Sequence, residues 1–140
     1  MVPRSLVRYG LDVSSIGKFI WAAPTSALGL LVVVAGAWRV RLRIVDGVLE
    51  AHGPALAWLL GHATLIGASA LTLGHVVIAR DARALDRTRA HERVHVRQCE
   101  RWGPLFVPAY LIASVIAFVR GRHSYFGNAF EVEAFDATRR

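Results

Sequence analysis

Two histidines and one glutamate stand at a spacing that suits metal chemistry. They form the sequence His91-Glu92-Arg93-Val94-His95, an HExxH pattern. On a helix, His91 and His95 lie one turn apart on the same face, so both imidazoles can bind one ion. Glu92 lies about 100° around the helix from His91, which puts its carboxylate beside the ion rather than on it. The pattern predicts a Zn²⁺ site in which Glu92 is the catalytic general base for an activated water.

A third protein ligand is needed, because two histidines and a water leave one position of tetrahedral zinc open. The candidates are the carboxylates that follow the motif: Glu100, Glu131, Glu133 and Asp136. Glu100 shares the HExxH helix but faces away from its histidines. On a second helix Glu131 and Glu133 would point about 200° apart, and Asp136 about 140° from Glu131. Only one of these three can therefore face the metal.

The stretches 73–78 (LGHVVI) and 89–98 (RAHERVHVRQ) resemble a known arrangement. They are similar to the compact gluzincin domain associated with contractile injection systems, in which a strand T-x-G-x-x-I/V precedes A-H-E-x-x-H-V-x-Q. Residues 130–134 (FEVEA) resemble the F-E-x-x-A-D segment of the CAAX prenyl protease and heat-shock membrane protease families. The resemblance covers roughly residues 70–137 and implies a gluzincin-type metallopeptidase fold.

In those families the first glutamate of F-E-x-x-A-D is the third zinc ligand, so the resemblance implies that His91, His95 and Glu131 bind the metal. This chain has Phe135 where the families have Asp, and Asp136 follows one place later. The contact that the family Asp makes around the metal is therefore changed here.

Other polar residues near the motif allow more than one interpretation. Gln98 falls within about 20° of His91 on the helix and either supports a ligand or simply lines the cleft. A buried, inert Cys99 is favoured over a thiolate ligand. His75 is expected to be packed or hydrogen-bonded. An oxyanion donor is expected among three residues that the sequence does not distinguish, namely Tyr110, His123 and Tyr125.

A long apolar segment precedes the domain. Residues 19–38 contain no charge, and twenty helical residues span about 30 Å, the thickness of the hydrocarbon core. Trp21 and Trp38 stand near its two ends, as in the aromatic belts of membrane helices. The segment predicts a transmembrane helix between an N-terminal basic segment, 1–18, and a metallopeptidase-like domain, 39–140.

The remaining pattern predicts an α+β domain. Alternation of arginine with apolar residues around an Asp46-Gly47 step indicates a β-hairpin, and 54–68 is ambiguous between helix and strand. The other expected elements are a strand at 71–79, the HExxH helix at 82–102 and a ligand helix at 129–139.

The apolar segment 105–119 resembles a second membrane helix. As a helix, however, its fifteen residues reach only about 22 Å. If the segment crossed a bilayer, Glu131 would lie on the opposite side from His91 and His95. We therefore expect it to pack over the HExxH helix or to dip into one leaflet.

The chain has 140 residues, 54% of them apolar, with a formal charge of +7 carried almost entirely by arginine. With an apolar segment present, this charge favours membrane lipid as a partner, whereas nothing in the pattern indicates nucleic acid. The arginine content also favours a single-pass protein with its domain on the cytoplasmic face. A single cysteine excludes an intrachain disulfide.

These features predict a membrane-anchored zinc peptidase acting on peptide bonds near the membrane surface. The alternatives are a catalytically inactive zinc-binding scaffold that holds a partner protein, and a metal-free membrane protein in which the cluster is structural. An intact Glu92 favours the enzyme, because a scaffold needs only the metal ligands. Neither the substrate nor the oligomeric state follows from the sequence.

Overall fold

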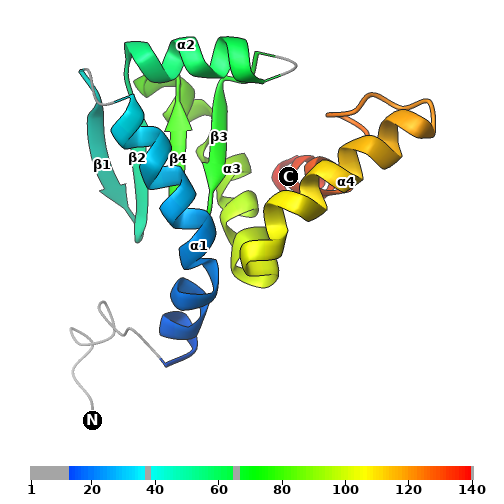
Figure 1. Cartoon of the computed structure of the whole chain (residues 1–140), viewed down its shortest axis with the longest axis horizontal. Helices are drawn as coiled ribbons and strands as arrows, with labels where there is room; N and C mark the ends of the chain where they lie inside the picture. Colours follow the sequence, from blue (N-terminus) through cyan, green and yellow to red (C-terminus); the bar gives the residue numbers. More distant parts are fainter. Residues whose placement is uncertain (1–12, 37–38, 65–66, 140) are drawn as a thin grey trace.

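A mixed four-stranded sheet with helices on both faces forms the domain (Figure 1). The computed structural model describes residues 13–36, 39–64 and 67–139, so Trp38 and most of the basic segment 1–18 lie outside the described residues. The strands are β1 (Arg41–Val45), β2 (Val48–His52), β3 (Ala70–Leu73) and β4 (Val76–Ala79), in the order β1-β2-β4-β3. The helices are α1 (Val13–Ala35), α2 (Pro54–Ala63), α3 (Ala82–Trp102), the short 3₁₀ helix η1 (Gly103–Leu105), α4 (Phe106–Val119) and α5 (Ala129–Thr138).

The hairpin predicted at 39–51 is confirmed as β1 and β2, which pair antiparallel. Its turn has positive φ at both Asp46 (51°) and Gly47 (76°), the conformation that a two-residue hairpin of matching twist requires. The ambiguous stretch 54–68 contains α2, a helix that begins at Pro54 and carries the chain from β2 toward β3.

The single strand predicted at 71–79 is wrong, because the chain reverses within it. Ala70–Leu73 and Val76–Ala79 pair antiparallel as β3 and β4. Gly74 has φ 63° and lies against Ser26 of α1, so neither the backbone conformation nor the space there suits a larger residue. Because apolar residues continue on both sides of the turn, the sequence pattern did not indicate it. His75 lies in this turn rather than within a strand.

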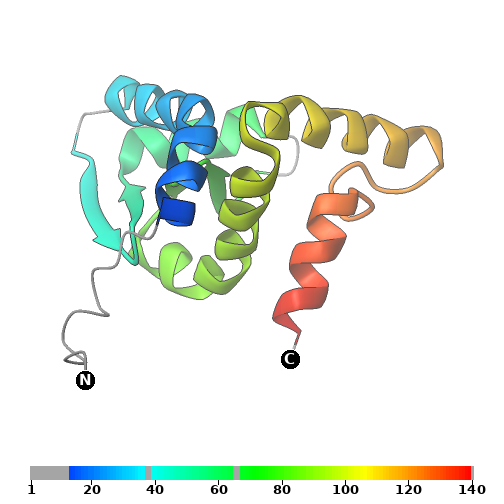
Figure 2. The same cartoon turned by 90° about the horizontal axis from the view of Figure 1, so that it is seen from below.

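Strand β4 is the centre of the core, and all four of its residues are buried. Val77 and Ala79 pack with Leu85 and Val96 of α3, whereas Val76 and Ile78 belong to the apolar cluster on the α1 side. The two helices thus cover opposite faces of the sheet (Figures 1 and 2). β4 pairs parallel with β2 and antiparallel with β3, which leaves β3 at the end of the sheet beside α3.

Helix α3 occupies the range 82–102 that its charge pattern predicts. The Asp81 side chain caps it by accepting from the Ala84 N–H at 2.8 Å, and Gly103 ends it with φ 56°. The chain then continues through η1 into α4, turns at Gly121 and returns as α5, which lies beside α3 (Figure 2). This return brings the second group of carboxylates back to the HExxH helix.

Helix α1 begins at Val13 and ends at Ala35, so it includes Lys18 and ends before the predicted boundary at 38. Two helical stretches among the described residues are long and apolar enough to cross a membrane: Ser15–Ala35, and a window within the continuous run Ala82–Val119.

Candidate metal centre

Three side chains from two helices converge at one point. His91 and His95 extend from α3, and Glu131 extends from the first turn of α5. The two Nε2 atoms lie 3.1 Å apart, and the Glu131 carboxylate oxygens lie 2.9 Å from His91 Nε2 and 3.3 Å from His95 Nε2. The donor atoms of all three residues fall within 4.8 Å of one another, so a single ion could contact all of them.

A hydrogen-bonded chain orients His95. Its Nδ1 donates to Gln98 Oε1 at 2.8 Å. The amide of Gln98 is held in that orientation because its Nε2 donates to the Phe130 carbonyl at 3.0 Å and to Glu133 at 3.2 Å. A neutral His95 with its proton on Nδ1 has its lone pair on Nε2, the atom that faces the cluster. Gln98 therefore supports a possible ligand, as one interpretation of the sequence proposed.

Glu131 is buried, and Tyr110 of α4 donates to its Oε1 at 2.6 Å. Burial raises the pKa of Glu131, but the hydrogen bonds to His91 and His95 lower it more, to about 2. Burial lowers the pKa of His95, and Glu131 and Glu92 reverse that change and raise it. Glu131 is thus an anion at neutral pH.

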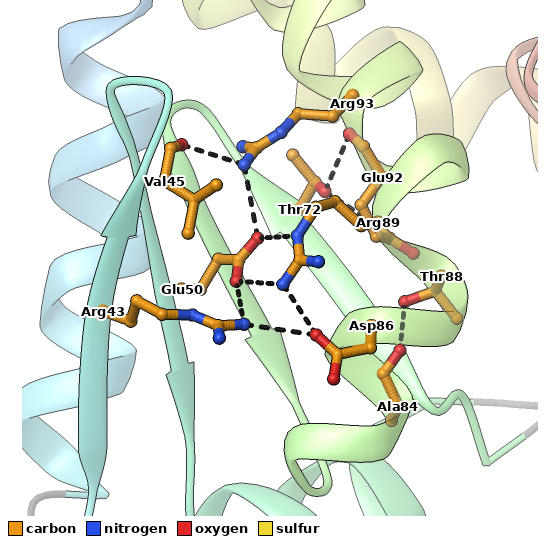
Figure 3. Close-up of polar contacts among 10 residues, drawn as sticks. All are labelled: Arg43, Val45, Glu50, Thr72, Ala84, Asp86, Thr88, Arg89, Glu92 and Arg93. Carbon is orange, nitrogen blue, oxygen red and sulfur yellow. Dashed lines mark hydrogen bonds and ion pairs between the residues drawn. The ribbon is translucent and has the colours of Figure 1, made fainter.

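Glu92 lies beside this cluster rather than in it. Its side chain is buried, and Thr72 Oγ1 of β3 donates to its Oε2 at 2.6 Å (Figure 3). Burial raises the pKa of this carboxyl, and the neighbouring His95 partly offsets the increase. A buried carboxylate with a raised pKa, held by Thr72 through one oxygen, is suited to exchange a proton with a neighbouring water.

The remaining carboxylates lie outside the cluster. Glu100 accepts from His75 Nε2 at 3.0 Å on another side of α3. Glu133 is exposed and pairs with Arg101 at 2.6 Å. Asp136 is exposed and lies 3.9 Å from Arg139. Of the four candidates from the sequence, the structure brings only Glu131 to the histidines.

The structure also places the other polar residues that the sequence singled out near the motif. Cys99 is fully buried, and burial raises its pKa to about 12, so it is a packed thiol. His75 is packed too: it stacks on Phe19 at 4.1 Å. His123 accepts from backbone N–H groups of its own turn. Phe135 lies against the His91 ring, with the two ring centroids 4.6 Å apart.

A cavity of about 370 Å³ lies over the cluster, between β3 and α4. Glu92, His95 and Glu131 line one part of it, and the rest of the wall is largely apolar. Tyr125 also lines the cavity, and burial raises its pKa. Tyr110 donates to Glu131, and Glu131 also contributes to the raised pKa of Tyr125, so both phenols lie beside the cluster, whereas His123 does not line the cavity.

Two supporting residues were missed by reasoning from the sequence. Thr72 donates to Glu92, and the sequence feature that could have indicated it is the threonine of the T-x-G pattern. Asn128 caps α5 by accepting from Phe130 N–H at 2.9 Å, while its Nδ2 donates to the Tyr110 carbonyl and to Ser114 Oγ at 3.0 and 2.9 Å. The sequence feature that could have indicated this role is an asparagine directly before a predicted helix, because asparagine is a preferred N-cap residue. Both hold the cluster from outside.

A second group of charges fixes α3 to the sheet. Glu50 of β2 is buried and accepts from Arg89 (2.8 and 2.9 Å), Arg43 (2.9 Å) and Arg93 (3.2 Å) (Figure 3). Exposed Asp86 joins through Arg89 and Arg43. The hydrogen bond from Arg89, opposed in part by burial, lowers the pKa of Glu50. We call these five residues the Glu50 cluster. Because Arg93 lies inside the HExxH motif, this cluster sets the rotation of the motif about the axis of α3.

No protein-family model matches this chain, and comparisons with curated proteins and with solved structures find no similar protein.

Proposed function

We propose that this protein is a zinc-dependent peptidase working at a membrane surface, with His91, His95 and Glu131 as zinc ligands and Glu92 as general base. The observation that carries the proposal is the convergence of three donor groups beside a buried carboxylate that is not one of them. A purely structural cluster would have no need of Glu92 in that position.

The donor set fits zinc. Two imidazole nitrogens and a carboxylate are ordinary ligands, and zinc–ligand bonds of about 2.0–2.1 Å at tetrahedral angles separate neighbouring donors by about 3.3 Å. The observed separations of 2.9, 3.1 and 3.3 Å are close to that value. The Nε2 lone pair of His95, directed by Gln98, also meets the requirement that a ligating imidazole be oriented through its other nitrogen.

When bound, zinc would supply Lewis-acid activation of a water at neutral pH. Glu92 takes the proton of the attacking water and passes it to the leaving amine, because its raised pKa makes it both an effective base and an effective acid. Thr72 holds the Glu92 carboxylate in place throughout. The phenol of Tyr125 is positioned in the cavity to donate to the developing oxyanion.

The shape of the site favours a peptide in extended conformation. β3 is the end strand of the sheet and lines the cavity along Ala70–Leu73. An extended chain can add to such an edge through backbone hydrogen bonds, which leaves alternate side chains to enter the apolar part of the cavity. The reaction class is therefore hydrolysis of a peptide bond within a chain.

The apolar surface of α1 supports a location at a membrane, and we propose that this helix holds the chain there. The segment length and the arginine content predict a single-pass arrangement with the domain on the cytoplasmic face. Because α1 packs on the domain through Ser26, Gly29 and Val33, we propose instead that the domain lies beside α1 at the membrane surface. Lys18 on α1 and Arg120 after α4 are exposed and available to anionic headgroups.

Metal content tests the first part of the proposal. Full-length protein purified gently should contain about one zinc per chain, as three protein ligands and one open position require. His91→Ala should lose the metal. His62→Ala, which removes an exposed histidine of α2, is the matched control and should keep it. A metal-free wild type, or equal metal in the two variants, would refute the zinc site.

Turnover is tested by Glu92→Gln, which cannot accept the proton. Wild type should cleave members of a fluorogenic peptide library, and the variant should retain zinc but lose cleavage. If Glu92→Gln still cleaves, Glu92 is not the base. If wild type binds zinc and a peptide stably but never cleaves it, the protein is the inactive scaffold instead.

A further inference from the structure

Helix α1 is packed along the domain over most of its length. Thr25 Oγ1 donates to the Gly103 carbonyl at 3.0 Å, and Ser26 Oγ accepts from the His75 N–H at 2.9 Å. Further along, a Cβ at Gly29 would lie 2.8 Å from Val76 Cβ, so helix and sheet are in close contact, and Val33 is buried in the core. One face of α1 is therefore part of the domain.

The opposite face of α1 is apolar and exposed. Ile20, Leu31 and Val34 keep 67–69% of their surface accessible. No charged residue occurs between Phe19 and Ala35. The other large apolar residues that α1 exposes are Ile16, Phe19, Trp21, Leu28 and Leu30.

Helix α4 repeats this two-sided pattern. Its inner side lines the cavity through Val107, Tyr110 and Ser114. The helix also exposes six large apolar residues, of which Leu111 borders the cavity as well, and the segment 106–119 contains no charge. They are Leu111, Ile112, Val115, Ile116, Phe118 and Val119.

The two helices that expose these apolar residues lie on the same side of the molecule. In Figure 2, α1 and α4 lie along the upper side of the molecule, while α3 and α5 lie below them. Figure 1 agrees, with α1 in front of the sheet and α4 in front of α5. A water-exposed apolar surface spread over two whole helices exceeds what a soluble monomer normally tolerates.

Helix length and flanking charge identify the partner as lipid. α4 alone has 14 residues, about 21 Å, which is too short to cross a hydrocarbon core of about 30 Å. A window of spanning length within Ala82–Val119 has to extend beyond α4 toward α3, which ends at Gly103 with φ 56°. The chain turns back directly after α4, at Gly121, to bring α5 to α3. Exposed basic residues stand at the borders of the apolar surface, with Lys18 near the start of α1 and Arg120 and Arg122 after α4. Such borders match anionic headgroups around a hydrocarbon-contacting face.

We propose that α1 and α4 together form one lipid-contacting surface, against which the whole domain lies. α1 is then a structural helix with one face in protein and one in lipid, rather than an isolated anchor. α4 separates the hydrocarbon from the cavity. The lipid contact does not depend on the zinc site, because none of the three possible ligands is on either helix.

Spin labels on the full-length chain in vesicles of phosphatidylcholine and phosphatidylglycerol test this surface. Single cysteines replace Leu31 on α1, Val115 on α4 and, as a matched exposed control, Ala137 on α5. Cys99 stays unlabelled because it is buried. Labels at 31 and 115 should be accessible to oxygen and shielded from a water-soluble nickel chelate, whereas the label at 137 should show the reverse.

Two results would overturn the proposal. If the label at 115 behaves like the one at 137, α4 lies in water and α1 alone contacts lipid. If shielding at 115 is accompanied by spin–spin broadening that disappears on dilution with unlabelled protein, a second copy covers the surface instead.

A charge on the same face gives an independent measurement. Val115→Glu should weaken binding to these vesicles about tenfold or more, since a charge in hydrocarbon is strongly disfavoured. Ala137→Glu adds the same charge on α5 and should bind like wild type. Circular dichroism checks that both variants fold. Equal binding of two folded variants would contradict a lipid contact at α4.

Discussion

Helix α3 contacts two buried carboxylates whose partners differ in kind. Glu50 is surrounded by three guanidinium groups, which hold permanent charge and fill its acceptor sites. Glu131 is surrounded by two imidazoles and a phenol, which can offer lone pairs or exchange protons. The acceptor sites of Glu50 are therefore saturated by the arginines, whereas Glu131 lines a cavity.

Along one helix, this difference distinguishes an ion cluster saturated by its own partners from a cluster that could hold a metal ion. The Glu50 cluster fixes α3 against β2 and involves Arg93 of the HExxH motif, so the rotation of the motif is set from outside the site. In the Glu131 cluster the two imidazoles can be neutral, so their lone pairs and the carboxylate can bind a cation together. Burial of a carboxylate alone therefore does not indicate function; the chemistry of its partners does.

The largest expected effect is on metal binding at Glu131. Glu131→Ala should weaken zinc binding by more than the roughly 10–100-fold typical of supporting residues, because it removes a direct ligand. Isothermal titration with zinc measures this. Glu133→Ala, two residues along the same helix, should change it far less, because Glu133 pairs with Arg101 at the surface and reaches the site only through its contact with Gln98. A larger loss at 133 than at 131 would contradict the assignment of the ligand.

Glu50→Gln should give the largest loss of stability. It removes one negative charge from among three arginines, and breaking a buried pair in this way costs about 3–5 kcal/mol. Urea unfolding in mixed micelles measures the free energy of unfolding. Asp86→Asn, which removes an exposed member of the same cluster, is the control and should change it little. Equal effects of the two variants would show that burial of Glu50 is unimportant.

Gln98→Ala should act on zinc through His95. Without the acceptor on Nδ1, the ring loses its fixed tautomer and orientation, and zinc affinity should fall about 10–100-fold. Gln98→Glu keeps an acceptor for His95 Nδ1 and should retain more affinity than Gln98→Ala. If the two variants bind zinc equally, Gln98 serves packing alone.

The smallest effect concerns acid pH. The pKa of Glu50 is lowered in the folded protein, so its contribution to stability is present above the unfolded value of about 4.3. That contribution is lost as pH falls through the folded pKa. Below about pH 4, wild type should therefore lose stability more steeply than Glu50→Gln, as thermal unfolding across pH 2–6 would show. Parallel curves would mean that Glu50 is not stabilised as an anion.

Much of the local structure could be predicted from the sequence. Charge periodicity defined α3 at 82–102, and the Asp46-Gly47 step marked the first hairpin, because both signals come from neighbours along the chain. The β3–β4 hairpin could not be found in this way. Its turn at Gly74 and His75 lies within a continuous apolar run, and the reversal is held by α1, which is distant in sequence.

For the site, the HExxH spacing by itself determined that His91 and His95 share a helix face and that Glu92 stands beside them. Helical geometry limited the third position to one carboxylate of a later helix without choosing it. The resemblance of residues 130–134 to a family segment selected Glu131, and the tertiary structure brings it to the histidines. That Thr72 holds Glu92 and that Glu50 orients the motif followed from the tertiary structure alone. These contacts join residues 20 to 43 positions apart. They depend on how α5 and the sheet pack against α3, and no local periodicity carries that information.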